Sequence, residues 1–363
     1  MIENRVENLR IKSAFGDYSV IEAADDASLY EYLALLEDAF FLVDSRVYDL
    51  AKLGKRLPPN RIFQVEATES SKNLDSVARI SSWLASNHAD KQSTLVAIGG
   101  GIIQDLATFT AAVYFRGIKW IFVPTTLLSM ADSCIGAKCA VNLKGHKNQL
   151  GVIHSPSEVV IVEEFLNTLS KDEFRSGFGE IFKLSVTGSR QFFSQLKEHL
   201  NQNGLQNKNM LQVIRSSLIS KQEVIELDEY EKDLRRVLNY GHTFGHALES
   251  ISKHTIPHGI AILFGMDLIN YLGVIWNITK EDFYLHFKNL IKEYYKDLNF
   301  EVNLHSKDLI NEILKDKKMY DGYMYFAIPK NIGEIIIIKK IVDEDLQIKI
   351  KEYLDNESIF NFS

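Results

Sequence analysis

TLVAIGGGIIQDL, residues 94–106, joins an apolar run to a helical pattern through three consecutive glycines. A short apolar run rich in branched residues is typical of a strand buried on both faces of a parallel sheet. Glycines between such a strand and a helix let backbone amides approach a pyrophosphate, and the helix N-terminus favours the anion. The spacing is not G-x-G-x-x-G, so the glycines taken alone fit a tight turn without a ligand equally well.

The alternation of strand and helix patterns extends on both sides of this stretch. Further strands are predicted at 39–45, 61–67, 119–126 and 158–164. The apolar spacing of 70–87 predicts an amphipathic helix between two of them, so we expect a parallel, Rossmann-like sheet with its ligand beyond the carboxyl ends of the strands. Asp44 ends one strand and could hold a ribose hydroxyl, although an aspartate there is more often a turn or cap residue.

Helical periodicity dominates the second half of the chain as far as about residue 315. Two β-branched runs at 323–329 and 334–341 then predict a hairpin, and a last amphipathic helix is expected from about Asp343. The pattern predicts an α/β protein with a Rossmann-like domain over 1–168 and a mainly helical domain over 169–363.

Composition and charge exclude several classes of protein. The chain has 363 residues, of which 46% are hydrophobic and 25% charged, and its formal net charge is -7 with both signs interspersed. Nothing in this pattern indicates a nucleic-acid or membrane partner, and no leader or uninterrupted transmembrane run stands out, so we expect a cytoplasmic protein. Cys134 and Cys139 are too few for a disulfide framework and are expected to be small buried hydrophobes.

A group of histidines with one glutamate is the most informative feature of the second half. His242 and His246, in LNYGHTFGHALE (238–249), share one face of a predicted helix. His258 starts the next apolar helix, and Glu180 places a carboxylate inside another. A buried charge needs a partner or a cation, and one glutamate with two histidines would make a catalytic zinc-type site. Any one of the histidines alone is better explained as a structural side chain.

Basic and amide side chains are more frequent around these motifs than the acidic average of the chain predicts. They could bind a phosphate at one end of a substrate and a carboxylate at the other, although each residue taken singly fits a solvated surface charge. Four polar residues fall within 132–148, a Gly-containing stretch of low regularity, and five more lie elsewhere. The set comprises Asp132, Lys138, Lys147, Asn148, Arg116, Lys183, Lys221, Arg235 and Asn239.

Six blocks between about Asp44 and Met266 resemble, in order and spacing, the 3-dehydroquinate synthase family of sugar phosphate cyclases. The blocks are GGGIIQDLATFTAAVYFRG (99–117), VPTTLLSMADSCIGAK (123–138), KN (147–148), EIFK (180–183), RRVLNYGHTFGHALE (235–249) and HGIAILFGM (258–266). The resemblance implies a homodimer with bound NAD and one divalent metal, usually Zn²⁺ with Co²⁺ as an alternative. It also implies that a seven-carbon keto-acid sugar phosphate, 3-deoxy-D-arabino-heptulosonate 7-phosphate, is converted to 3-dehydroquinate and phosphate. In that reaction NAD is transiently reduced, phosphate is eliminated, the hydride returns and an aldol step closes the ring, as a step of aromatic amino-acid (shikimate) synthesis.

The resemblance also assigns residues. Glu180, His242 and His258 match the metal ligands, and His246 matches the catalytic histidine, with Lys138, Asn148 and Arg235 also expected to take part in catalysis. The positions that match NAD contacts are Asp44, Glu69, Lys72, Gly100, Gly101, Asp105, Thr125, Thr126, Asp132, Lys147 and Thr168. The positions that match substrate contacts are Arg116, Lys138, Lys147, Asn148, Lys183, Lys221, Arg235 and Asn239, with Lys317 or Lys318 as a further lysine.

Some positions depart from the family pattern. Ala137 and Cys139 interrupt a common Gly-Gly-Lys-Thr run, and Ile260 replaces a common glutamate. Three alternatives remain: a sibling cyclase for an amino analogue, a hexose 6-phosphate or a heptulose phosphate without carboxylate, such as a 2-deoxy-scyllo-inosose or 2-epi-5-epi-valiolone synthase; a metal-dependent polyol dehydrogenase; and a binding protein that has kept the fold. Arg235 and Asn239 favour the carboxylate substrate.

Overall fold

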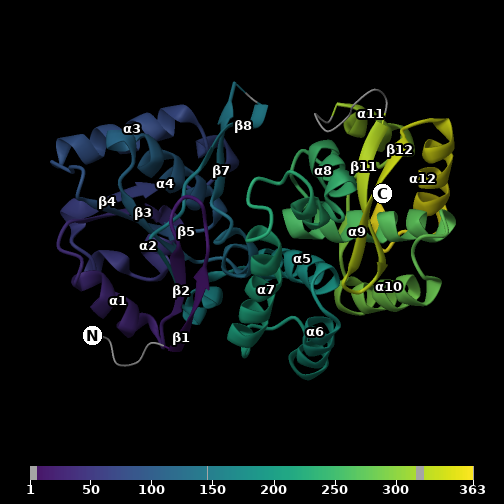
Figure 1. The fold of residues 1–363 in the computed structure, drawn as a ribbon, viewed down its shortest axis with the longest axis horizontal. Coiled ribbons are helices and arrows are strands. Elements are labelled where there is room, and N and C mark those ends of the chain that lie inside the picture. Colours follow the sequence, from purple (N-terminus) through teal and green to yellow (C-terminus); the bar gives the residue numbers. More distant parts are fainter. Residues whose placement is uncertain (1–5, 145, 316–322, 363) are drawn as a thin grey trace. The chain divides into compact units, whose positions relative to one another are not determined.

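The computed structural model describes residues 6–144, 146–315 and 323–362. It divides into two compact units, Met1–Ser170 and Lys171–Ser363, drawn from purple to teal and from teal to yellow in Figure 1. Each unit has a hydrophobic core of its own. The predicted α/β class, with a parallel sheet followed by a mainly helical region, is confirmed.

The first unit is built on a seven-stranded sheet in the order β1-β2-β9-β6-β5-β3-β4. All neighbouring strands are parallel except β1 and β2, which form an antiparallel pair at one edge. Four predicted strands and the strand at 94–99 all form, and each ends slightly earlier than its apolar run. The strands are β1 Val6–Ile11, β2 Tyr18–Glu22, β3 Ala39–Asp44, β4 Ile62–Val65, β5 Thr94–Gly99, β6 Lys119–Pro124 and β9 Glu158–Ile161.

Helices cover the sheet because its central strands carry apolar side chains on both faces. Leu95, Val96 and Ile98 of β5 have no exposed surface, and α4 packs on this part of the sheet. Helix α3 buries Val77, Ile80 and Leu84 but leaves Leu74 at 38% exposure, since that residue opens the helix and lies beyond the covered stripe. The helices are α1 Asp26–Ala34, α2 Ser45–Leu50, α3 Leu74–Ser86 and α4 Gly101–Val113.

Residues 129–153 are more regular than their composition predicts. A π-helical turn, η5 (Ser129–Ser133), precedes an antiparallel hairpin of β7 (Lys138–Leu143) and β8 (His146–Ile153). Only Cys139 and Val141 of β7 are deeply buried, against α4, so the strand shows too little apolar alternation to be recognised. The 3-10 turns of the first unit are η1 Leu53–Lys55, η2 Pro59–Arg61, η3 Glu69–Ser71, η4 Tyr114–Arg116 and η6 Glu163–Thr168.

The second unit is mainly helical around α9, whose residues from Gly259 to Asn270 are all buried. Helix α9 is the one helix among those described that is long and apolar enough to cross a membrane, and 78% of that span is buried inside the chain, as expected for a core helix. The hairpin of β11 and β12 forms as predicted, with Gly333 at φ 76 in its turn, and Asp343 caps the last helix.

Helices occupy most of residues 171–314, the region where helical periodicity is predicted to dominate. The helices are α5 Lys171–Thr187, α6 Arg190–Asn203, α7 Met210–Ile225, η7 Leu234–Asn239, α8 His242–Ile251, α9 His258–Ile275, α10 Glu281–Tyr295, α11 Ser306–Leu314 and α12 Glu344–Asn356. The strands are β10 Asn299–Phe300, β11 Tyr323–Asn331, β12 Glu334–Ile341 and β13 Asn361–Phe362.

Candidate active site

Three helices of the second unit, α5, α8 and α9, bring the predicted metal ligands together because their backbones pack without intervening side chains. A Cβ atom on Gly259 would lie 1.7 Å from the carbonyl oxygen of Ser176 in α5. A Cβ atom on Gly265 would lie 1.9 Å from the carbonyl oxygen of Gly241, at the start of α8. Glycine is therefore required at both contacts, and each contact lies close in sequence to a predicted ligand.

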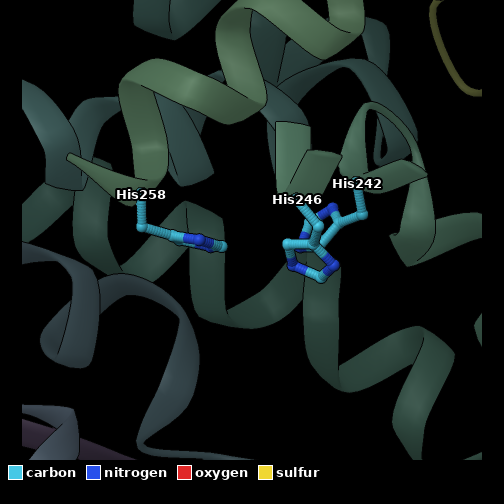
Figure 2. A group of neighbouring side chains, drawn as sticks. All are labelled: His242, His246 and His258. Carbon is cyan, nitrogen blue, oxygen red and sulfur yellow. The ribbon is translucent and has the colours of Figure 1, made fainter. Parts of the chain in front are cut away.

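The side chains of Glu180, His242 and His258 converge on one point. Nε2 of His258 lies 2.9 Å from Oε1 of Glu180, and Nε2 of His242 lies 3.6 Å from the same oxygen. Figure 2 shows His242 and His246 side by side on α8, with the ring of His258 directed toward them from α9. Nitrogens of the three histidines also lie within 4.8 Å of one another. The spacing of His242 and His246 on one helix face is as predicted.

The two histidines next to Glu180 differ in charge. Burial and the positive charge of Lys183 hold the pKa of His242 well below its usual value, so this imidazole is neutral. Its Nδ1 lies 3.2 Å from the carbonyl oxygen of Tyr240, which leaves Nε2 as the acceptor. Burial also opposes the charged form of His258, but hydrogen bonds with Glu180 and Glu249 outweigh it and raise the pKa of His258 to about 10.

These donors fit a divalent cation. Two imidazole nitrogens and one carboxylate oxygen are the ligand set of a catalytic zinc centre that keeps a position open for substrate. Glu180 is 2% exposed, and a carboxylate buried this deeply requires positive partners. Lys183, one turn further along α5, supplies one of them with Nζ at 2.5 Å from Oε2 of Glu180. A bound cation would replace the proton that His258 holds toward Glu180.

The other substrate residues predicted in this unit lie on elements that pack against α5. Lys221 on α7 is 7% exposed and Arg235 on η7 is 6% exposed, and both α7 and η7 contact α5. Nη1 of Arg235 donates a hydrogen bond to the carbonyl oxygen of Glu229 at 2.6 Å. Asn239, at the end of η7, donates from Nδ2 to Oε1 of Glu231 at 2.7 Å.

Asp228 organises the loop before Arg235. Its carboxylate accepts backbone N–H groups from Lys232 at 2.8 Å, Asp233 at 2.8 Å and Arg235 at 3.0 Å. Burial opposes ionisation of Asp228, but these three hydrogen bonds outweigh it and lower the pKa to about 2. The loop is therefore held by an ionised carboxylate at neutral pH.

A second cluster of predicted residues lies in the first unit. Lys72, Asp105, Lys138 and Asn148 line a pocket of about 480 Å³ between α4 and the β7–β8 hairpin. Nζ of Lys72 lies 3.1 Å from Oδ2 of Asp105 and 2.7 Å from Oδ1 of Asn148. Burial raises the pKa of Asp105 despite the attraction of Lys72.

Glu69 extends this cluster and links two further predicted residues. Its Oε1 lies 3.7 Å from Nζ of Lys72 and 3.8 Å from Nζ of Lys147. The same oxygen accepts a hydrogen bond from Nδ2 of Asn142 at 2.8 Å. Asn142 in turn accepts from the backbone of Asn148 at 2.9 Å, so the hairpin and the η3 turn hold one polar network.

Five further predicted cofactor residues lie at the carboxyl ends of neighbouring parallel strands. Asp44 ends β3, Gly100 and Gly101 follow β5, and Thr125 and Thr126 follow β6, which are adjacent in the sheet. Asp44 also caps α2 by accepting the N–H of Arg46 at 2.9 Å, the cap role left open by the sequence. Asp132 lies buried in η5, and Thr168 lines a second pocket of about 670 Å³ with Arg46 and Tyr30.

Arg116, a further predicted substrate residue, does not line either of the two pockets described above. Arg116 is exposed on the turn after α4, where Phe115, Arg116 and Gly117 all have positive φ. Lys317 and Lys318 lie outside the described residues.

Sequence reasoning missed three carboxylates, Glu249, Asp228 and Glu231. Oε2 of Glu249 lies 3.1 Å from Nδ1 of His258. The place of Glu249 three residues after His246 on the same helix was the available signal. Asp228 and Glu231 hold the loop before Arg235 and the side chain of Asn239, and a loop leaves no periodic pattern in the sequence.

Comparisons with known proteins identify the family of this chain. Family models of the 3-dehydroquinate synthase N-terminal and C-terminal domains match residues 62–176 and 177–319. The 3-dehydroquinate synthase of Dictyoglomus thermophilum is 37% identical over 312 residues, which are 85% of this chain and 87% of that protein.

Two solved structures share the fold. A 2-deoxy-scyllo-inosose synthase complexed with carbaglucose-6-phosphate, NAD+ and Co2+ has a TM-score of 0.85 at 23% identity, over 95% of this chain and 100% of that one. ValA, a 2-epi-5-epi-valiolone synthase from Streptomyces hygroscopicus subsp. jinggangensis 5008 with NAD+ and Zn2+ bound, has a TM-score of 0.82 at 23% identity, over 97% and 99%. The fold is that of sugar phosphate cyclases, and the chain belongs to the 3-dehydroquinate synthase family.

Proposed function

We propose that the chain converts 3-deoxy-D-arabino-heptulosonate 7-phosphate to 3-dehydroquinate and phosphate, acting as a phosphate-eliminating carbon–oxygen lyase. The observation that carries the proposal is the convergence of Glu180, His242 and His258, with Nε2 of both histidines 2.9 and 3.6 Å from one carboxylate oxygen. Membership of the family supports the choice of reaction.

The same three side chains are our candidates for the ligands of a divalent cation, Zn²⁺ or Co²⁺. A bound cation would lower the pKa of a substrate hydroxyl and hold the substrate in place. Glu180 is preferred to His246 as the third ligand because its carboxylate is buried between the other two, whereas the His246 side chain is 49% exposed. Lys183 balances the charge of Glu180 and is a candidate contact for substrate oxygens.

His246 is proposed to move a proton at the substrate hydroxyl. Its ring is half exposed, so it is accessible to a substrate or to a water molecule. An imidazole can both accept and return a proton.

The first unit is proposed to hold NAD, which would accept and return a hydride at the substrate. Residues 1–168 would form this domain and 169–363 the metal- and substrate-binding domain. The assignment is supported by five residues at the carboxyl ends of β3, β5 and β6, where such folds bind dinucleotides: Asp44, Gly100, Gly101, Thr125 and Thr126. Glu69, Lys72, Asp105, Asp132, Lys147 and Thr168 complete the proposed NAD set.

Lys138, Asn148 and Arg116 are the proposed phosphate contacts, and Lys221, Arg235 and Asn239 the proposed carboxylate contacts. A homodimer in the cytoplasm, serving aromatic amino-acid synthesis, completes the proposal. Arg235 favours the keto-acid substrate over the uncharged sugar phosphates of sibling cyclases, because a guanidinium buried to 6% exposure is suited to a carboxylate.

The proposal is tested by turnover. The zinc- and NAD-loaded protein is incubated with the keto-acid sugar phosphate, and phosphate release is followed alongside the mass of the product. We expect equal amounts of phosphate and dehydroquinate with no net NADH. Turnover of a hexose 6-phosphate or of a heptulose phosphate without carboxylate would instead identify a sibling cyclase, and net NADH with glycerol a polyol dehydrogenase.

Arg235→Ala tests the carboxylate contact. We expect a higher KM and a lower kcat with zinc still stoichiometric, because Arg235 is not a proposed ligand of the cation. Arg236→Ala is the matched control, since Arg236 lies 5.7 Å from the ring of Tyr325 and serves packing. Loss of zinc from Arg235→Ala would contradict the assigned role.

A further inference from the structure

Glu249, in the last turn of α8, is a half-buried carboxylate that the proposed reaction does not use. Its side chain is 15% exposed. Oε2 lies 3.1 Å from Nδ1 of His258, and the same oxygen lies 4.0 Å from Nε2 of His246. The residue therefore contacts one proposed ligand directly and lies next to the proposed catalytic histidine.

The contact with Glu249 decides which nitrogen of His258 is available. A carboxylate accepts a hydrogen bond, so Nδ1 of His258 must carry a proton when it faces Glu249. The other nitrogen, Nε2, then points at Oε1 of Glu180 at 2.9 Å. In a neutral imidazole protonated at Nδ1, the lone pair lies on Nε2, which is the atom that converges with His242 and Glu180.

His242 is held in the same way by a group that side-chain substitution cannot remove. Its Nδ1 faces the carbonyl oxygen of Tyr240 at 3.2 Å, and Nε2 again faces Glu180. Both imidazoles therefore present Nε2 to one point while Nδ1 is occupied by an oxygen acceptor. Glu249 is the one of these two acceptors that is a side chain.

We propose that Glu249 is a positioning residue that fixes the tautomer and ring orientation of His258 for binding a divalent cation through Nε2. The inference rests on the proposed metal site. Carboxylates that accept from the second nitrogen of a metal-binding histidine increase its basicity and hold its ring in place.

The test measures zinc affinity of the full-length protein by competition with a chromophoric chelator. We expect Glu249→Gln to weaken zinc binding and Glu249→Ala to weaken it further, by about 10- to 100-fold, because the amide keeps an acceptor without the charge. Glu312→Gln is the matched control, since Glu312 is a nearby acid that contacts Ser250 and Lys315 and, within the described part of the chain, no histidine. Its zinc affinity should equal that of the unaltered protein.

A second measurement needs no substitution at Glu249. ¹⁵N NMR of the histidine side chains in the zinc-loaded, unaltered protein should show His258 protonated at Nδ1 and coordinated through Nε2. Coordination through Nδ1, or equal zinc affinity for Glu249→Ala and the unaltered protein, would overturn the inference.

Failure of the inference is separable from failure of the proposed function. If the unaltered protein binds no zinc, or if Glu180→Gln and His242→Ala leave zinc binding intact, the proposed metal site itself is wrong. If those two variants lose zinc while Glu249→Ala keeps it, only the role of Glu249 is wrong.

Discussion

Gly259→Ala tests whether the packing of α5 on α9 creates the metal site. The added Cβ atom would lie 1.7 Å from the carbonyl oxygen of Ser176, whereas real Cβ contacts are essentially never closer than 3.0 Å. Because the obstacle is backbone, the helices must separate by more than about 1 Å. The hydrogen bond from the N–H of Gly259 to Oγ of Ser176, 3.0 Å long, would be stretched or lost.

The displacement acts on the residue next to Gly259. His258 would move with the start of α9, whereas Glu180 would stay with α5, and metal–ligand distances tolerate only about 0.2 Å of change. We expect zinc affinity to fall at least about tenfold, equivalent to about 1.4 kcal/mol. Overpacking of this kind also costs about 1 to 3 kcal/mol of folding stability, and we expect the upper end because backbone cannot rotate away.

Two assays measure these effects separately. Urea unfolding of the metal-free protein reports the free energy of unfolding, and chelator competition reports zinc affinity. Gly101→Ala is the control for both, because a Cβ atom on Gly101 would meet nothing within 4 Å. A Gly259→Ala protein with an unchanged unfolding midpoint and unchanged zinc affinity would refute the packing argument.

Three further substitutions probe the site and the core. Asp228→Ala removes the acceptor of three backbone N–H groups before Arg235, so KM should rise several-fold with zinc content unchanged; unchanged kinetics would contradict the role of this loop. Asp267→Asn removes a fully buried carboxyl group, and burial raises the pKa of this group to about 6 from its usual 3.8. The stability that Asp267 contributes is therefore complete below about pH 4 and is lost as the pH rises through 6. Between pH 4 and 7 the free energy of unfolding of the variant should therefore fall less than that of the unaltered protein, by up to about 3 kcal/mol. An equal fall in both proteins would show that Asp267 does not cause the pH dependence. Tyr240→Phe removes the 2.9 Å hydrogen bond to Asn270 in the core and should lower the free energy of unfolding by about 1 kcal/mol while zinc still binds, because the carbonyl oxygen that faces His242 remains.

The sequence predicts what depends on local periodicity. His242 and His246 could be placed on one helix face from their spacing, and the apolar strands 39–44 and 94–99 from their composition. The close approach of Glu180 and His258 could not be derived in this way. It joins residues 78 apart in the chain and depends on two glycine contacts that only the packed helices reveal.

The sequence does not predict the β7–β8 hairpin or the role of Glu249, for different physical reasons. In the hairpin only alternate residues of one strand face the core, and the rest are polar, so the pattern resembles that of a loop. Glu249 lies on α8, whose apolar face dominates the sequence pattern, and its partner His258 lies at the start of the next helix, α9. The spacing of Glu249 from His246 indicates a shared helix face, but the contact with His258 depends on how α9 packs on α8.

Glu180, His242 and His258 are proposed to hold one cation. Anomalous scattering at the zinc edge, from crystals of the zinc-loaded protein, tests this proposal most directly. We predict one zinc ion per chain at about 2.0 to 2.2 Å from Nε2 of His242, Nε2 of His258 and an oxygen of Glu180. Zinc bound by His246 in place of Glu180, or bound away from these side chains, would contradict the account.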